Sequence, residues 1–222
     1  MFNITIDGVA GCGKSSLADE LSRRLNLKKF NTGMVYRAIT CEYLSRFRGE
    51  PSIEKIAKLL TSLNVKVEFI DGKQVVFVNN HDYSKILRNE NVSNMTPYVS
   101  GYGELREKVR EIQRTFAKHN DCIMEGRDIG RVVLKDAQVK LFLTACDEVR
   151  AKRRFEQMKG QKDCPTFEEV LKDIKKRDEE DRKREHGAMI PADDAVIVDN
   201  SNETLDQTVN RCIEIINEKR RF

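Results

Sequence analysis

Residues 8–15 read Gly-Val-Ala-Gly-Cys-Gly-Lys-Ser, which matches the pattern G-x-x-x-x-G-K-[ST]. The glycines allow consecutive backbone N–H groups to turn inward onto a phosphate, and the N-terminus of a following helix adds positive potential. Lys14 supplies charge for the β and γ oxygens, and Ser15 can offer a hydroxyl to Mg²⁺. The segment therefore predicts a phosphate-binding loop placed between a strand and a helix.

The residues on either side of this loop supply the strand and the helix that the motif requires. Residues 2–6 are typical of a short buried strand, and Leu17, Leu21 and Leu25 recur at helical spacing. From Gly11 the chain reads Gly-Cys-Gly-Lys-Ser-Ser, so the pattern G-x-G-x-x-G is absent. The loop is therefore not a dinucleotide-binding loop.

Length and composition favour a folded protein that binds small anions. The 222 residues predict one large domain or one domain with insertions, and 39% hydrophobic residues suffice for a core, which excludes disorder as the main state. A net charge of +4 is small beside the polybasic tracts of dedicated nucleic-acid binders. The chain has no long apolar run, and its first residues lack a signal-peptide pattern, so we expect a soluble cytoplasmic protein.

The metal-binding residue types are scattered. Six cysteines form no Cys-x-x-Cys pair, and three histidines have no ligand spacing. We therefore expect reduced thiols and no structural zinc.

The first half of the chain combines helices with an antiparallel insert. A strand over 27–31 leads into a helix that ends near Gly49 and Pro51, and a further helix covers about 53–63. Residues 65–70 and 74–79 flank Asp71-Gly72, a pair that readily takes the positive φ angles of a tight hairpin.

The second half returns to alternating strands and helices. Apolar residues from Leu105 to Phe116 mark a long helix, and buried strands are predicted at 122–124 and 139–145. Thr166 and Glu169 form a capping box that opens a helix running to about residue 184. A last strand over 196–198 precedes a C-terminal helix, which completes an α/β pattern.

Two polar segments follow predicted strands, where an open parallel sheet binds ligands. Arg37, in the run from Asn31 to Arg37, can grip a second phosphate, or it can be a solvated helix residue. Residues 125–130 (Glu-Gly-Arg-Asp-Ile-Gly) place an arginine and a carboxylate between glycines, and a plain surface turn is the alternative.

Two charged segments occur in the last third of the chain. Residues 172–185 are charged except at Ile174, which is typical of a solvated helix, yet Arg177, Asp181 and Arg184 form one stripe that can close over an anion. Arg153, Arg154 and Gly160 lie in a polar stretch that is either a mobile lid or a basic loop.

Together these segments resemble the bacterial cytidylate kinases over nearly the whole chain. The segments that carry the likeness are Gly8–Ser16, the turn Thr32-Gly33-x-x-Tyr36-Arg37, the Asp71-Gly72 hairpin, Glu125–Asp128 and Arg177-x-x-x-Asp181-x-x-Arg184. The resemblance implies a single P-loop kinase domain over 1–222, a three-layer α/β sandwich with a parallel core sheet. It also implies an antiparallel insert that binds the nucleoside monophosphate (about 37–100, strands about 65–84) and a short lid (about 154–166).

The resemblance also implies a reaction and its participants. ATP and Mg²⁺ serve to phosphorylate CMP, and also dCMP, giving CDP and ADP in pyrimidine nucleotide metabolism. Nucleic acid and membranes are not expected partners, and the chain is expected to be a monomer. The alternatives are a kinase for another monophosphate or small metabolite and a non-catalytic nucleotide-binding switch.

The resemblance assigns site residues as follows. Catalytic roles fall to Lys14, Arg127, Asp128 and Arg184. ATP contacts fall to Gly8, Val9, Ala10, Gly11, Cys12, Gly13, Lys14, Ser15, Ser16, Arg153 and Arg154, with Ser15 also on Mg²⁺. CMP contacts fall to Thr32, Arg106 and Asp128 (cytosine), Arg37, Arg127 and Arg184 (phosphate), and Arg177 and Asp181 (ribose).

The sequence departs from the family pattern at two of these places. Thr32 stands where the family often has serine, and Pro97 stands where a hydroxyl residue is expected. The adjacent Thr96 is the candidate to compensate for Pro97.

Overall fold

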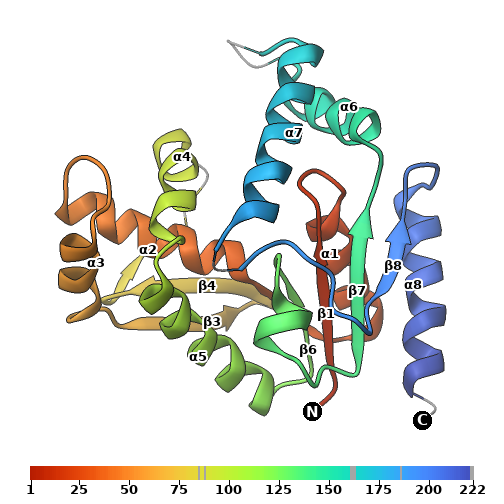
Figure 1. Cartoon of the computed structure of the whole chain (residues 1–222). Helices are drawn as coiled ribbons and strands as arrows, with labels where there is room; N and C mark the ends of the chain where they lie inside the picture. The colour runs from red at the N-terminus through yellow and green to blue at the C-terminus, as the bar shows by residue number, and fades with distance from the viewer. Residues whose placement is uncertain (85, 88, 161–163, 186, 221–222) are drawn as a thin grey trace. The chain divides into compact units, whose positions relative to one another are not determined.

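The structure is a computed structural model that describes residues 1–84, 86–87, 89–160, 164–185 and 187–220 (Figure 1). The chain divides into two compact units, one formed by residues 1–28 and 120–222 and the other by residues 29–119. The second unit contains the insert predicted over 37–100 and extends beyond it at both ends.

A parallel sheet forms the centre of the first unit. The sheet contains β1 (Asn3–Gly8), β6 (Cys122–Glu125), β7 (Val139–Thr144) and β8 (Val196–Asp199). These strands lie in the order β6-β1-β7-β8. All neighbouring pairs are parallel, and Ile4 pairs with Ile123 on one side and with Val139 on the other. β1 and β7 are near-continuous buried runs, as expected for parallel strands covered on both faces. The predicted α/β pattern is confirmed.

The boundary between the units falls inside strand β2 (Lys28–Asn31). Its first residue belongs to the first unit, where the Lys28 N–H donates to the Asp121 carbonyl at 3.4 Å.

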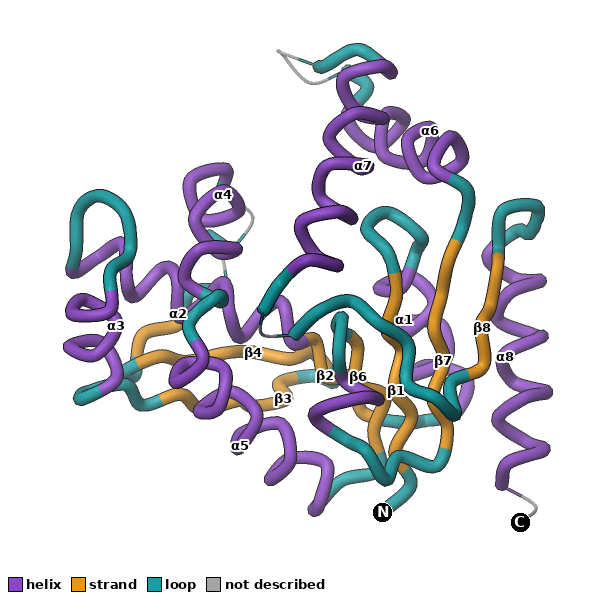
Figure 2. The backbone as a smooth tube through the Cα atoms, in the orientation of Figure 1, coloured by secondary structure: helices purple, strands orange, loops and turns teal. Residues whose placement is uncertain are grey.

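Helices α1 (Lys14–Leu25) and α8 (Leu205–Arg220) pack on this sheet (Figure 2). Leu17 and Leu21 from α1 and Ile216 from α8 belong to one buried cluster with the β1 residues Ile4 and Ile6. The predicted helix after the phosphate loop is therefore confirmed, and its leucine stripe fixes it to the strand that precedes the loop.

Helices α6 (Asp147–Met158) and α7 (Phe167–Lys183) form an adjoining pair in the same unit. A small apolar cluster joins them, in which Phe155 meets Phe167 edge to face at 6.4 Å between ring centroids. The predicted capping box of Thr166 and Glu169 opens α7.

The alternative of a basic loop was wrong for Arg153 and Arg154, because both lie inside α6. The lid stays a prediction. Only a few of the α6 side chains are apolar, so the sequence signal is weak, and packing on α7 stabilises the helix. Of the predicted lid over 154–166, residues 154–158 belong to α6 and residues 161–163 lie outside the described part.

The second unit combines helices with an antiparallel sheet. Its helices are α2 (Thr32–Arg46), α3 (Ile53–Leu60), α4 (Glu90–Val99) and α5 (Gly103–His119), and its sheet contains β3 (Val65–Ile70), β4 (Lys73–Val78) and β5 (His81–Asp82) in that order. Asp71 and Gly72 have φ angles of 50° and 74°, so the predicted hairpin turn is confirmed. Helix α4 was not predicted from the sequence; it contains Pro97 and buries only Val92 and Val99.

Helix α5 buries a polar side chain that its apolar spacing did not predict. Ile112 and Phe116 are half-buried, whereas Gln113 is 1% exposed. The Gln113 Nε2 donates to Thr32 Oγ1 at 2.8 Å, which compensates for its burial.

Within the described ranges, no helix has the length and apolar character needed to cross a membrane.

Candidate active site

The phosphate loop joins β1 to α1, and its glycines have conformations that other residues take up only with strain. The φ angles are 142° at Gly8, 74° at Gly11 and 94° at Gly13. A Cβ atom at Gly8 would lie 2.0 Å from the Leu143 carbonyl oxygen of the neighbouring strand β7. The close approach of β7 therefore requires glycine at the start of the loop.

Lys14, the first residue of α1, turns its side chain back into this loop. The ammonium donates to the Gly8 carbonyl at 2.9 Å and to the Val9 carbonyl at 2.6 Å, and it lies 3.7 Å from Cys12 Sγ. Burial lowers the pKa of Lys14 to about 8, and the nearby positive charge of Arg127 adds to this effect. The ammonium is thus placed among the loop's backbone groups with its charge poorly solvated.

Ser15 and Glu125 bring two oxygen ligands together beside the loop. The Ser15 hydroxyl donates to Glu125 Oε2 at 2.8 Å, and Glu125 is buried at the end of β6. Mg²⁺ commonly takes one or two protein oxygens and completes its shell with phosphates and water. Among the described residues no group of three or more His, Cys, Asp or Glu could hold a metal alone. The pair therefore fits an ion that arrives with a nucleotide.

An arginine cluster gathers around Asp181 of α7. Arg127 Nε donates to Asp181 Oδ2 at 2.8 Å, and Arg184 Nη2 lies 2.9 Å from Asp181 Oδ1. Burial acts to raise the pKa of the Asp181 carboxyl, but the positive charges of Arg127 and Arg184 outweigh it and lower that pKa. Arg177 lies on the same helix, four residues before Asp181, and it is exposed. One carboxylate thus holds the guanidinium groups of Arg127 and Arg184 close together.

The same cluster reaches the phosphate loop. Arg127 Nη1 donates to the Gly8 carbonyl at 3.2 Å. Residues from three segments far apart in sequence, at 8, 127 and 181, are therefore linked through one arginine.

Asp7 is a buried acid that the sequence analysis missed. Its carboxylate oxygens accept from the N–H groups of Ile129 at 2.9 Å and Gly130 at 2.8 Å. Burial raises the pKa of Asp7 to about 6, although the two hydrogen bonds act to lower it. The negative charge of Asp128 also contributes to the rise. An acidic residue at the end of an apolar strand, directly before the glycine-rich loop, was the signal available in the sequence. Asp7 fixes the backbone just after Arg127 and Asp128.

Asp128 directly precedes a π-helical turn, η1 (Ile129–Val133), and its side chain is buried. A Cβ atom at Gly126 would lie 2.6 Å from Ile129 Cγ1, so glycine is needed where the chain turns after β6. The turn and the hydrogen bonds to Asp7 give Asp128 a fixed backbone.

The second unit brings Thr32, Tyr36 and Arg106 near one another. Thr32 is the first residue of α2, and Arg106 of α5 places its guanidinium 5.7 Å from the centroid of the Tyr36 ring. Arg106 is 5% exposed and donates to the Ser100 carbonyl at 3.4 Å. Arg37 is half-buried on the same helix as Tyr36.

The hydroxyl of Thr96 is engaged within its own helix. Thr96 Oγ1 donates to the Val92 carbonyl at 2.6 Å, and Pro97 follows it inside α4. Thr96 as the residue that compensates for Pro97 stays a prediction.

Arg153 and Arg154 have different surroundings on α6. Arg153 donates to the side-chain oxygen and the carbonyl of Asn200 at 3.0 and 2.9 Å, and Asn200 Nδ2 donates to the Cys12 carbonyl of the loop at 3.0 Å. Arg154 is exposed. Arg153 is therefore tied to the phosphate loop through Asn200.

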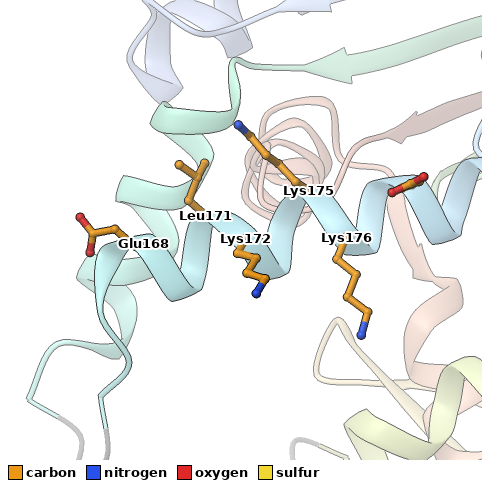
Figure 3. A pocket seen from close by; sticks show the side chains of 6 residues that line it. Glu168, Leu171, Lys172, Lys175 and Lys176 are labelled. Carbon is orange, nitrogen blue, oxygen red and sulfur yellow. The ribbon is translucent and has the colours of Figure 1, made fainter.

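The exposed face of α7 carries a shallow hollow outside this cluster. Figure 3 shows Glu168, Leu171, Lys172, Lys175 and Lys176, five of its six lining side chains, projecting from one helix. It includes none of the predicted site residues. Lys183 and Glu179 form an exposed ion pair at 2.5 Å, so the outer face of α7 is solvated, as one of the two interpretations of this segment predicted. Asp181 lies on the buried face of the same helix.

The strand, loop and helix at 3–25, together with the parallel sheet, define a nucleotide-binding P-loop fold. Residues 4–218 match the family model described as Cytidylate kinase. Curated proteins named cytidylate kinase are 37% identical over 96% of this chain and 94% of the protein from Caldicellulosiruptor saccharolyticus, and 36% identical over 96% of this chain and 97% of the one from Clostridium botulinum strain Loch Maree. The chain belongs to the cytidylate kinase family.

A solved structure agrees with this fold. TT1252 from Thermus thermophilus matches with a TM-score of 0.50 and 13% identity, over 98% of this chain and 97% of that chain.

Proposed function

We propose that this protein transfers the γ-phosphoryl group of ATP to CMP, giving CDP and ADP. The observation that carries the proposal is a contact between a candidate residue for the acceptor phosphate and the candidate ATP loop. Arg127, a candidate for the acceptor phosphate, donates to the carbonyl of Gly8, the first residue of the candidate ATP loop. A phosphate held by Arg127 lies next to the loop that holds the phosphate donor.

On the ATP side, the loop of residues 8–16 and the Lys14 ammonium hold the phosphates. The oxygens of Ser15 and Glu125 would help to hold Mg²⁺, which supplies charge neutralisation between the phosphates when bound. Arg154 is an exposed candidate for a further ATP contact, and Arg153 acts near the loop through Asn200.

On the acceptor side, Arg37, Arg127 and Arg184 bind the CMP phosphate, and Arg177 and Asp181 bind the ribose. Thr32, Arg106 and Asp128 bind the cytosine. Phosphoryl transfer brings two anions together, so it depends on alignment and on positive charge placed where negative charge develops. Asp181 holds Arg127 and Arg184 as a fixed pair, which reduces the cost of ordering them on the substrate.

A turnover assay separates this proposal from its alternatives. ADP formation is measured with CMP, dCMP, UMP, AMP and no acceptor. We expect CMP to be used best, dCMP to be used as well, and little ADP without an acceptor. A preference for another monophosphate would favour the first alternative, and ATP binding with no turnover would favour a nucleotide-binding switch. We further propose that the protein acts as a monomer in the cytoplasm, without nucleic acid, and light scattering in solution tests the monomer.

Replacing Asp181 should weaken CMP binding selectively. In Asp181→Ala, Arg127 and Arg184 lose their shared carboxylate, so we expect the KM for CMP to rise about tenfold or more, consistent with charge-assisted hydrogen bonds. The KM for ATP should change by less than about threefold, because Lys14 and the loop amides remain.

Glu179→Ala is the matched control, because Glu179 is an exposed acid of the same helix. Equal weakening of ATP and CMP, or no effect of Asp181→Ala, would contradict the role proposed for Asp181.

The lowered pKa of Lys14 predicts a pH dependence of ATP binding. Below its pKa of about 8, Lys14 is mostly charged and attracts the ATP phosphates. As the pH rises through 8, Lys14 loses its proton and ATP binding weakens. We expect the KM for ATP to rise about tenfold per pH unit above 8, because ATP binds the protonated lysine. The KM for CMP should stay nearly flat, since arginines keep their charge in this range. Initial rates between pH 7 and 9.5 test this, and a flat KM for ATP would contradict it.

A further inference from the structure

We propose that Asp178 and Arg150 are positioning residues for the ATP loop, which they hold by gripping both backbone groups of Ala10. The proposal rests on the proposed function, in which residues 8–16 bind ATP. Asp178 and Arg150 come from α7 and α6, so the shape of the loop depends on this helix pair.

The contacts form a closed triangle. The Ala10 N–H donates to Asp178 Oδ1 at 3.0 Å, and Arg150 Nη1 donates to the Ala10 carbonyl at 2.7 Å. The third side is the ion pair of Arg150 Nη1 with Asp178 Oδ2 at 2.6 Å. Ala10 thus has its donor and its acceptor satisfied by two side chains that also satisfy each other.

The three residues of this triangle are buried, and their burial indicates that the ion pair has a role besides stabilising the fold. Arg150 is 2% exposed, Asp178 3% and Ala10 6%. Removing two charges from water is costly, and buried ion pairs often give little net stability over apolar residues. Here each partner of the pair also makes a hydrogen bond to the backbone of Ala10 in the phosphate loop. An apolar replacement would leave both backbone groups of Ala10 buried without partners.

Packing at the next residue supports the same role. A Cβ atom at Gly11 would lie 3.4 Å from Arg150 Cβ and 3.7 Å from Ile174 Cδ1. The turn of the loop therefore lies directly against α6 and α7. These helices support the loop by contact as well as by hydrogen bonds.

The position of Asp178 in α7 places its contact with the ATP loop close in sequence to the proposed CMP-binding residues. Asp178 follows Arg177 directly, and Asp181 lies one turn further along. The same helix therefore holds the ATP loop at Ala10 and carries the proposed CMP-binding residues. A shift of α7 moves the loop, and small misplacements of reacting groups cost large factors in rate.

The test compares two substitutions at Asp178. Asp178→Ala removes the hydrogen bond from the Ala10 N–H and the ion pair with Arg150. We expect the Kd for ATP, measured by calorimetric titration without CMP, to rise about tenfold or more. We expect kcat to fall by at least about tenfold. Asp178→Asn keeps an oxygen for the Ala10 N–H and loses the charge, so it should recover a substantial part of the ATP affinity.

Asp147→Asn is the matched control. Asp147 pairs with the same arginine at 2.5 Å, but its side chain is 39% exposed and it belongs to the first turn of α6. We expect this variant to change the Kd for ATP by less than about threefold.

Two results would overturn the proposal. One is a folded Asp178→Ala protein that melts at a lower temperature yet keeps its ATP affinity and kcat. The other is equal loss of ATP affinity in Asp147→Asn. If Asp178→Ala does not fold, Asp178→Asn and Arg150→Lys decide the matter, and normal ATP affinity in both would overturn it. Because ATP binding is measured without an acceptor, failure of the unmodified protein to phosphorylate CMP is distinguishable from failure of this proposal.

Discussion

Lys14→Ala is expected to fold normally and to phosphorylate CMP about 10² to 10³ times more slowly than the unmodified protein, the usual effect of removing one group that stabilises transition-state charge. The ammonium lies among the carbonyls of Gly8 and Val9, inside the loop that carries ATP in the proposed function. As the phosphoryl group moves, negative charge builds on oxygens that this ammonium faces.

The fold should survive, because the loop is set by features independent of this lysine. The glycine conformations and the leucine stripe of α1 remain, and circular dichroism with thermal melting checks this. Lys172→Ala is the matched control, since Lys172 lies on the exposed face of α7 (Figure 3) and should have a normal kcat. Near-normal turnover of CMP by folded Lys14→Ala would show that the loop is not the ATP site.

Asp128→Asn is expected to narrow the preference for CMP over UMP by about 10-fold to 100-fold in kcat/KM, since sites that hydrogen-bond a substrate group strongly reject analogues that lack it. Cytosine presents an exocyclic amino group, from which a carboxylate can accept a hydrogen bond. Uracil presents a carbonyl oxygen at the same place. Asp128 is 4% exposed, so an unpaired oxygen there is costly.

The asparagine amide can donate to uracil, so turnover of CMP should fall while that of UMP falls less or rises. Measuring both kcat/KM values in both proteins gives the change in ratio. Asp136→Asn is the control, because Asp136 is an exposed acid a few residues further along. An unchanged ratio in Asp128→Asn would remove Asp128 from base recognition. Equal use of CMP and UMP by the unmodified protein would contradict the proposed acceptor itself.

The features that could be predicted from the sequence are those encoded within a few neighbouring residues. The phosphate loop needs its glycines for local φ angles, the Asp71-Gly72 hairpin needs two positive φ angles, and the capping box needs Thr166 three residues before Glu169. Leucine spacing in α1 and the apolar runs of β1 and β7 likewise need only a short window.

The features that were missed have weak local signals. Helix α6 carries many charges and few apolar residues, and packing against α7 stabilises it. Helix α4 contains a proline, and its apolar positions are sparse. Gln113 reads as a surface residue, yet it is buried because its partner Thr32 lies 81 residues away in sequence.

By itself, the sequence determined the P-loop, the alternation of strands and helices and the family to which the chain belongs, because these depend on backbone conformation and periodicity over short stretches. Only the tertiary structure decided which polar side chains meet at the loop. Asp7 holds the turn after Asp128, and Asp178 binds Ala10 from 168 residues away. Such pairs form when the fold brings buried faces together, and desolvation then requires each charge to find a partner. That requirement leaves no pattern along the chain.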